Sequence, residues 1–276
     1  MRGQCMAGGA AMARTGSEDT LAQGSFVRAL RAEALKSRHG APVRLAIVLA
    51  LPFPLLAAFV ALSVPQFGLS YSPWNYWYAL LMPVSITLIA ATVANADARL
   101  GNHTLLSSGV PLHLAWGAKV AWCLALLLLS NLVVFAVYAV MSLVVPQGAA
   151  SMSAMLAVAL ALTVMGSWMI PATHFLTMRV GMLAGVFVPL AVQLALSLGW
   201  SVVPFWPACP PVATIVLPTA FLPVLPSGEP ASPGMALVES LSQGPDVALA
   251  LIVAAVLTAA LTAAGAVWLD RSEELR

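Results

Sequence analysis

The sequence has 276 residues, of which 61% are hydrophobic and only 8% are charged. A soluble domain carries about 25% charged residues, so this composition excludes an ordinary water-soluble fold. The net charge of +2 is uninformative as a total, and the three cysteines have no spacing typical of a disulfide framework or a metal site.

The first 44 residues precede any long apolar run. Residues 1–19 are predicted to be a disordered tail, and residues 20–44 are rich in Arg and Lys. One side of a helical wheel carries an apolar stripe made of Phe26, Val27, Leu30 and Ala34. Glu33 and Leu35 interrupt that stripe. The pattern favours an interfacial helix on the inner leaflet over a solvated basic leader.

Six apolar runs follow, and each is long enough to cross a membrane. A helix rises about 1.5 Å per residue, so about 20 apolar residues cross a hydrocarbon core of about 30 Å. The runs are continuous rather than alternating, which favours helices over barrel strands. We therefore predict an all-α membrane protein whose six-span domain covers residues 45–270. Its helices are expected at 45–64, 76–94, 120–145, 152–171, 180–200 and 247–269.

Local signals add detail to these spans. Pro52 and Pro54 predict a kink in the first span. Asn131 in the third span and Gln193 in the fifth are the strongly polar residues within the predicted spans. Each is favoured as an interhelical hydrogen-bonding group, and the alternative is contact with a transported substrate.

Two connections stand out. Residues 95–119 read NADARLGNHTLLSSGVPLHLAWGAK and predict a short helix over 97–106, then a break, then a new helix that starts near Pro111. Such a helix could dock a cytoplasmic partner, although composition alone favours a simple connector. Residues 201–245 hold ten of the twenty prolines and yet contain VATIVLPTAFLPVL. This segment is too broken to span and too apolar for a solvated loop, which predicts a re-entrant or surface-packed segment that either gates or covers the bundle.

The cations fix the expected topology. All twelve Lys and Arg lie before the first span, in the connections 95–119 and 172–179, or after the sixth span. The positive-inside rule then puts both ends of the chain in the cytoplasm, with residues 271–276 as a short tail.

Familiar catalytic motifs are missing from the sequence. It contains no GxxxxGK[ST], HExxH or GxSxG pattern. No ionisable residue falls in the middle of a predicted span, whereas proton-coupled transporters and intramembrane enzymes need such groups. This absence favours a pore component driven by another subunit, or an assembly or sensor component.

The order of segments resembles a known family over roughly residues 26–127. A basic leader (FVRALRAEALKSRHG) and SPWNYWYALLMP precede the 95–119 connection, as in the permease subunits of type-2 ABC exporters, and among them the lantibiotic- and bacteriocin-immunity permeases. The matched positions are Trp74, Tyr76, Pro83, Asp97, Leu105, Pro111, Ala118 and Lys119.

The resemblance implies a function and its partners. A separate cytoplasmic ATPase would bind MgATP, and two permease subunits, identical or related, would form an export path in the bacterial cytoplasmic membrane. The substrate would be a lantibiotic-like peptide or another amphiphile, exported for self-immunity or resistance. This chain is expected to be no enzyme, to hold no cofactor or metal, and to contact membrane lipid but no nucleic acid. Coupling to the ATPase would use Asp97, Arg99, Leu100, Asn102, His103, Leu105 and Leu106.

Two alternatives stay open. One is an ABC permease that exports drugs or lipids. The other is a membrane assembly or sensor component that transports nothing.

Overall fold

The computed structural model describes residues 26–38, 40–98, 111–232, 234–242 and 244–274. In these residues the fold is all-α, and strand pairing is limited to one isolated bridge between Val224 and Pro230. Five helices are long and apolar enough to cross a membrane, which indicates a multi-pass membrane protein. They are Ala41–Ser63, Ser72–Ala96, Leu112–Val144, Met152–Arg179 and Pro245–Arg271.

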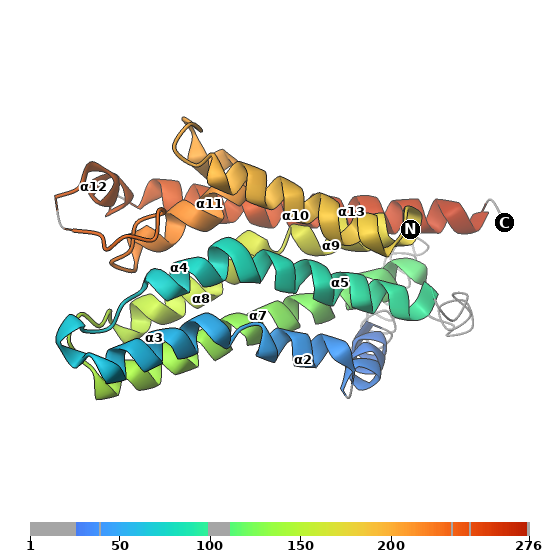
Figure 1. The fold of residues 1–276 in the computed structure, drawn as a ribbon. Coiled ribbons are helices and arrows are strands. Elements are labelled where there is room, and N and C mark those ends of the chain that lie inside the picture. Colours follow the sequence, from blue (N-terminus) through green and yellow to red (C-terminus); the bar gives the residue numbers. More distant parts are fainter. Residues whose placement is uncertain (1–25, 39, 99–110, 233, 243, 275–276) are drawn as a thin grey trace, which may run out of the picture.

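The helices are labelled as in Figure 1. Residues 26–37 form a first helix without a label. It is followed by α2 (Ala41–Val48), α3 (Pro52–Ser63), η1 (Pro65–Phe67), α4 (Ser72–Tyr76), the π-helical turn η2 (Trp77–Leu81), α5 (Met82–Ala98), α7 (Leu112–Val144), α8 (Met152–Gly166), α9 (Met169–Arg179), α10 (Met182–Leu198), η3 (Trp206–Ala208), α11 (Pro210–Val216), η4 (Leu217–Ala220), α12 (Ala236–Ser242) and α13 (Pro245–Glu274).

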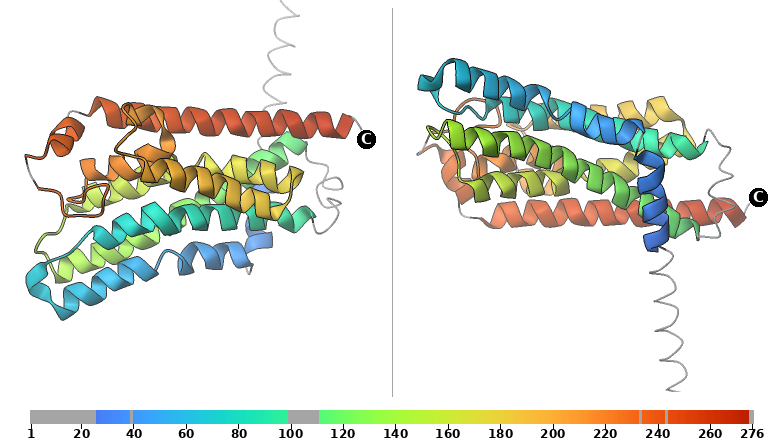
Figure 2. Two further views of the ribbon diagram at one scale, coloured as in Figure 1. Left: turned by 45° about the horizontal axis from the view of Figure 1, so that its top comes forward. Right: turned by 90° about the horizontal axis from the view of Figure 1, so that it is seen from below.

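The long helices run back and forth between two ends of an elongated bundle (Figure 1). We call one of them the basic end. It holds helical residues 26–37, the start of α7 and the end of α13 (Figure 2). Every Lys and Arg that the structure describes lies toward this end, whereas the opposite end carries Glu229, Glu239 and Asp246. The charge separation read from the sequence is therefore a separation in space.

Prolines account for the irregular points within the helices. The first apolar helix breaks between Val48 and Pro52, so the expected kink is confirmed. In the next helix Pro83 cannot donate to the carbonyl four residues earlier, and its ring crowds that carbonyl. The wider turn η2 lies immediately before it and accommodates the ring.

Two helices extend well beyond the apolar runs predicted for them. The fourth apolar run was expected to end at Pro171, but the helix continues to Arg179. Pro171 occupies the first turn of α9, where a missing amide proton costs nothing. The third apolar run was expected from residue 120, and a new helix leading into it was expected to start near Pro111. α7 begins at Leu112, directly after Pro111, which confirms that start, and it continues through the apolar run as one helix of 33 residues.

The helices differ in how deeply they are buried. Within the most apolar stretch of each helix, 56% of Ser72–Ala96 and 67% of Met152–Arg179 is buried, against 17% of Pro245–Arg271. The first two therefore form the centre of the bundle, and α13 lies at its edge. Large apolar side chains such as Phe59, Leu183 and Ile252 face outward. Exposed apolar surface of this extent is typical of a lipid-facing protein.

The proline-rich segment packs into the opposite end of the bundle. All seven residues of α11 are buried, and α11 contacts α8, α10 and α13. Its apolar side chains are thereby removed from water, as a re-entrant or surface-packed segment requires.

Candidate functional site

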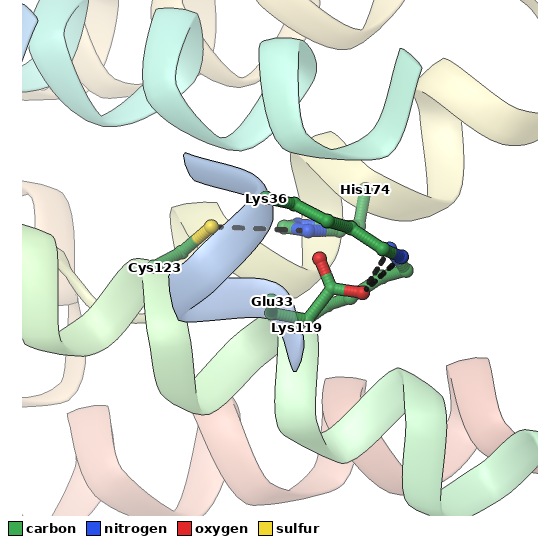
Figure 3. A network of polar contacts seen from close by, with 5 residues as sticks. All are labelled: Glu33, Lys36, Lys119, Cys123 and His174. Carbon is green, nitrogen blue, oxygen red and sulfur yellow. Dashed lines mark hydrogen bonds and ion pairs between the residues drawn. The ribbon is translucent and has the colours of Figure 1, made fainter. Parts of the chain in front are cut away.

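The basic end holds a buried cluster of polar groups between three separate parts of the chain. Helical residues 26–37 lie across the long helices rather than along them (Figure 2). Glu33 on this helix faces Lys119 on α7 (Figure 3). The Glu33 Oε1 to Lys119 Nζ distance is 3.0 Å, and the two side chains are only 9% and 3% exposed. The ion pair therefore fastens the crosswise helix to α7.

A second lysine completes the charges around Glu33. Lys36 lies one turn further along the same helix, and its Nζ is also 3.0 Å from Glu33 Oε1. Its side chain is 41% exposed, so water screens this second contact more than the first. Since the Lys119 ammonium is withdrawn from solvent, Glu33 is the acid that compensates its charge.

Beside the ion pair, Cys123 on α7 meets His174 on α9 (Figure 3). His174 Nδ1 is 2.9 Å from the carbonyl of Ile170, which only accepts hydrogen bonds, so Nδ1 carries the proton. In the neutral ring, Nε2 is then the acceptor for the Cys123 thiol, at 3.9 Å. Among the described residues, no three His, Cys, Asp or Glu side chains are grouped closely enough to hold a metal ion.

Trp116 extends the cluster to a fourth helix. Its ring packs edge-on against His174, with centroids 5.7 Å apart, and is 1% exposed. Its indole N–H donates to the carbonyl of Thr262 on α13 at 3.0 Å. On the same face of α13, Gly265 contacts the Trp116 ring directly, and a side chain there would collide with it. The crosswise helix, α7, α9 and α13 therefore meet at one place.

The residues expected to couple to an ATPase lie mostly outside the described ones. Asp97 falls in the last turn of α5, which ends at Ala98. Beyond the described residues lie Arg99, Leu100, Asn102, His103, Leu105 and Leu106. Their role as a coupling helix stays a prediction. The helix before them and the helix after them, α5 and α7, both reach the basic end (Figure 1).

Asn131 lies in a hydrogen-bonded bridge between helices. Its Oδ1 accepts from the indole N–H of Trp77 at 3.1 Å, and its Nδ2 donates to Thr163 Oγ1 at 3.1 Å. The side chain is 1% exposed, and the bridge links its own helix, α7, to η2 and α8. These contacts support the interhelical role rather than an open substrate contact.

Gln193 makes a similar link at the opposite end. Its Nε2 donates to Ser197 Oγ at 2.9 Å and to the carbonyl of Pro211 at 3.2 Å. These bonds hold α11 against α10. Its Oε1 is buried without a hydrogen-bond partner among the described residues. Asn131 and Gln193 therefore belong to two different contacts and not to one polar path.

Sequence reasoning missed the pairing of Glu33. The apolar stripe was expected at Phe26, Val27, Leu30 and Ala34, yet Val27 is 61% exposed and Glu33 only 7%. The buried side of the helix is turned toward Glu33 because that carboxylate reaches Lys119. The signal was present, since Glu33 was the residue that broke the apolar stripe and the acidic residue of an otherwise basic helix.

Comparison with known proteins adds no assignment: no family model, no curated protein and no solved structure matches this chain.

Proposed function

We propose that this chain is the permease subunit of an ABC exporter, energised by a separate ATPase and paired with a second permease subunit, identical or related. Its substrate is a lantibiotic-like peptide or another amphiphile. The proposal rests on the resemblance of residues 26–127 and on the architecture of the basic end.

The observation that carries the proposal is that two consecutive helices of the bundle meet one connection at the basic end. α5 ends there at Ala98 and α7 begins there at Leu112, so residues 99–110 join two helices of the bundle. α7 then continues for 33 residues without a break. Displacement of this connection by an ATPase would be transmitted along α7 to the opposite end, because a continuous helix moves as a rigid element.

Charge placement supports an external energy source. Within the described apolar helices, Lys119 and His174 lie toward the basic end, and Lys119 is ion-paired with Glu33. The middle of these helices carries no Asp, Glu, Lys, Arg or His side chain through which protons could pass. ATP hydrolysis on a partner subunit would supply the work instead.

We further propose that α10 is a sixth crossing, which leaves both ends of the chain in the cytoplasm. Its 17 residues reach about 26 Å. Leu183 near one end of α10 and Leu198 at the other are 74% and 79% exposed, as expected for a helix in contact with lipid along its whole length.

The coupling test uses three apolar residues of the connection. In the triple variant L100D/L105D/L106D, we expect the protein to insert normally, to lose co-purification with an ATPase that carries a phosphate loop, and to lose export. The matched control S227D/S232D/S240D adds the same three charges at exposed positions of the opposite end and should keep both activities. Full export by the coupling variant would contradict the proposal.

The substrate class is tested in cells. Deletion of the gene should raise sensitivity to lantibiotics by about tenfold or more and leave sensitivity to unrelated lipophilic drugs unchanged. The reverse pattern would favour drug export, and no change in either would favour an assembly or sensor role.

A further inference from the structure

The outward side of the crosswise helix carries cations around an exposed leucine. At 3.6 residues per turn, Arg31, Leu35 and Arg38 fall within about 60° of one another. All three are exposed, and Leu35 is 60% exposed. Glu33, the acidic residue in the stretch 26–38, lies on the opposite side of the helix and is held by Lys119. Within the described stretch 26–38, the outward side is therefore cationic, and its one carboxylate faces away.

A third cation extends this surface. Arg44 is exposed in the first turn of α2, shortly after the crosswise helix ends. Within the described part of the chain, no carboxylate lies within ion-pair distance of Arg31, Arg38 or Arg44. Their charges are thus available to an external anion.

The position of the helix indicates which kind of external anion can reach these cations. It runs across the long helices and so lies roughly parallel to the plane of the membrane (Figure 2). Residues 38–40 alone separate it from α2, which begins the first apolar helix. A helix that lies beside the start of the first apolar helix is at the level of the lipid headgroups. Guanidinium groups form bidentate hydrogen bonds to phosphate. An exposed leucine between them reaches the boundary with the lipid acyl chains.

We propose that Arg31, Arg38 and Arg44, with Leu35 between them, bind the phosphate groups of anionic lipids in the leaflet at the basic end. The Glu33–Lys119 ion pair sets the rotation of the helix about its axis, and so turns these cations toward the lipid. The proposal needs a membrane protein but not an exporter, so it stands or falls separately from the proposed function.

The test uses the full chain alone, reconstituted in phosphatidylcholine vesicles. Energy transfer from the protein's tryptophans to dansyl-labelled phosphatidylglycerol is compared with transfer to dansyl-labelled phosphatidylcholine. The wild-type chain should prefer the anionic probe, and the preference should fall in 1 M salt. Each near-surface cation contributes about fivefold to such binding, so R31Q/R38Q should lower the preference by about 25-fold.

A matched control removes two other exposed cations at the same end. R179Q/R271Q should change the preference by less than about threefold, because these side chains lie on α9 and α13. An equal loss in both double variants would mean diffuse attraction and would overturn the site. No preference in the wild-type chain would also overturn it. In that case, loss of a co-purifying acidic protein from R31Q/R38Q would reassign the surface to a protein partner.

A further variant tests the role of the ion pair. E33L/K119M keeps all three cations but removes the contact that sets their direction. We expect the preference for the anionic probe to fall by about threefold or more, and an unchanged preference would show that the rotation of the helix does not depend on this pair.

Discussion

At the scale of single residues, the Glu33–Lys119 ion pair is the described contact whose loss we expect to lower the stability most. Both side chains of this pair are largely withdrawn from solvent, so losing the contact between them is costly. We predict that E33Q lowers the free energy of unfolding by about 3 kcal/mol, because it removes the carboxylate that pairs with the buried Lys119 ammonium. Thermal unfolding of the detergent-solubilised chain measures this loss.

Two variants at the same place serve as controls. K36Q removes the exposed partner of Glu33 and should cost less than about 1 kcal/mol. E33L/K119M removes both charges together and should recover most of the stability that E33Q loses, because no unpaired charge remains. If E33Q and K36Q had the same cost, the ion pair would not be the contact that fastens the crosswise helix to α7.

Asn131 gives a second residue-scale prediction. Hydrogen bonds between membrane helices average about 0.6 kcal/mol and reach about 1.7 kcal/mol. We expect N131A and T163V each to destabilise the protein by about 1 kcal/mol. The double variant should cost less than the sum of the two, because both remove one shared bond.

T262V is the matched control for this pair, since Thr262 Oγ1 bonds within its own helix to the carbonyl of Thr258. It should change the stability by less than about 0.5 kcal/mol. If N131A instead abolished export without affecting stability, Asn131 would be a substrate contact.

At the scale of elements, α9 and α10 form a hairpin that depends on one glycine. A Cβ on Gly185 would collide with Thr177 Oγ1 and lie 2.9 Å from the Thr177 backbone nitrogen. The absence of a side chain therefore lets the two helices approach closely. We predict that G185A destabilises the protein by about 1–3 kcal/mol, as overpacking usually does.

Gly117 on α7 is the matched control, because a Cβ added there would meet only a Phe26 ring carbon, at an ordinary 3.6 Å. G117A should be neutral or slightly stabilising, since Ala favours helix more than Gly does. Equal losses in the two variants would show that helix propensity and not close packing explains the G185A effect.

The helices themselves could be predicted because apolar runs have a length that lipid dictates. The kink at Pro52 could be predicted because proline lacks the amide proton that a continuous helix needs. What the sequence could not give is which helices touch. Glu33 and Lys119 are 86 positions apart, and Cys123 and His174 are 51 apart, and no local pattern links such residues. The end of α9 was missed because Pro171, near the start of that helix, was treated as a boundary.

At the scale of the whole molecule, the separation of charge orients the bundle. Cations gather at the basic end, and the opposite end carries Glu229, Glu239 and Asp246. Under the positive-inside rule the basic end faces the cytoplasm. The number of crossings then depends on α10, an apolar helix of 17 residues that is shorter than the five long ones.

Two single-cysteine variants decide between five and six crossings. Ser227 and Arg271 are both exposed, the first in the proline-rich segment that precedes α13 and the second in the last turns of that helix. S227C and R271C are made in a background with C5S, C123A and C209S. If α10 crosses, a membrane-impermeant maleimide added to intact cells should label S227C but label R271C only after permeabilisation.

The opposite labelling pattern would indicate five crossings. If α10 lies against the bundle without crossing, residue 227 stays on the cytoplasmic side, and α13 carries residue 271 to the outside. S227C would then be protected and R271C labelled. That result would contradict the six-span arrangement. It would also place the end of α13 and the crosswise helix on different sides of the membrane, although the structure brings α13, α7 and the Glu33–Lys119 pair together at the basic end. Because the side chains of Trp116 and Lys119 join these elements over a few residues of α7, we expect the labelling to follow the six-crossing pattern.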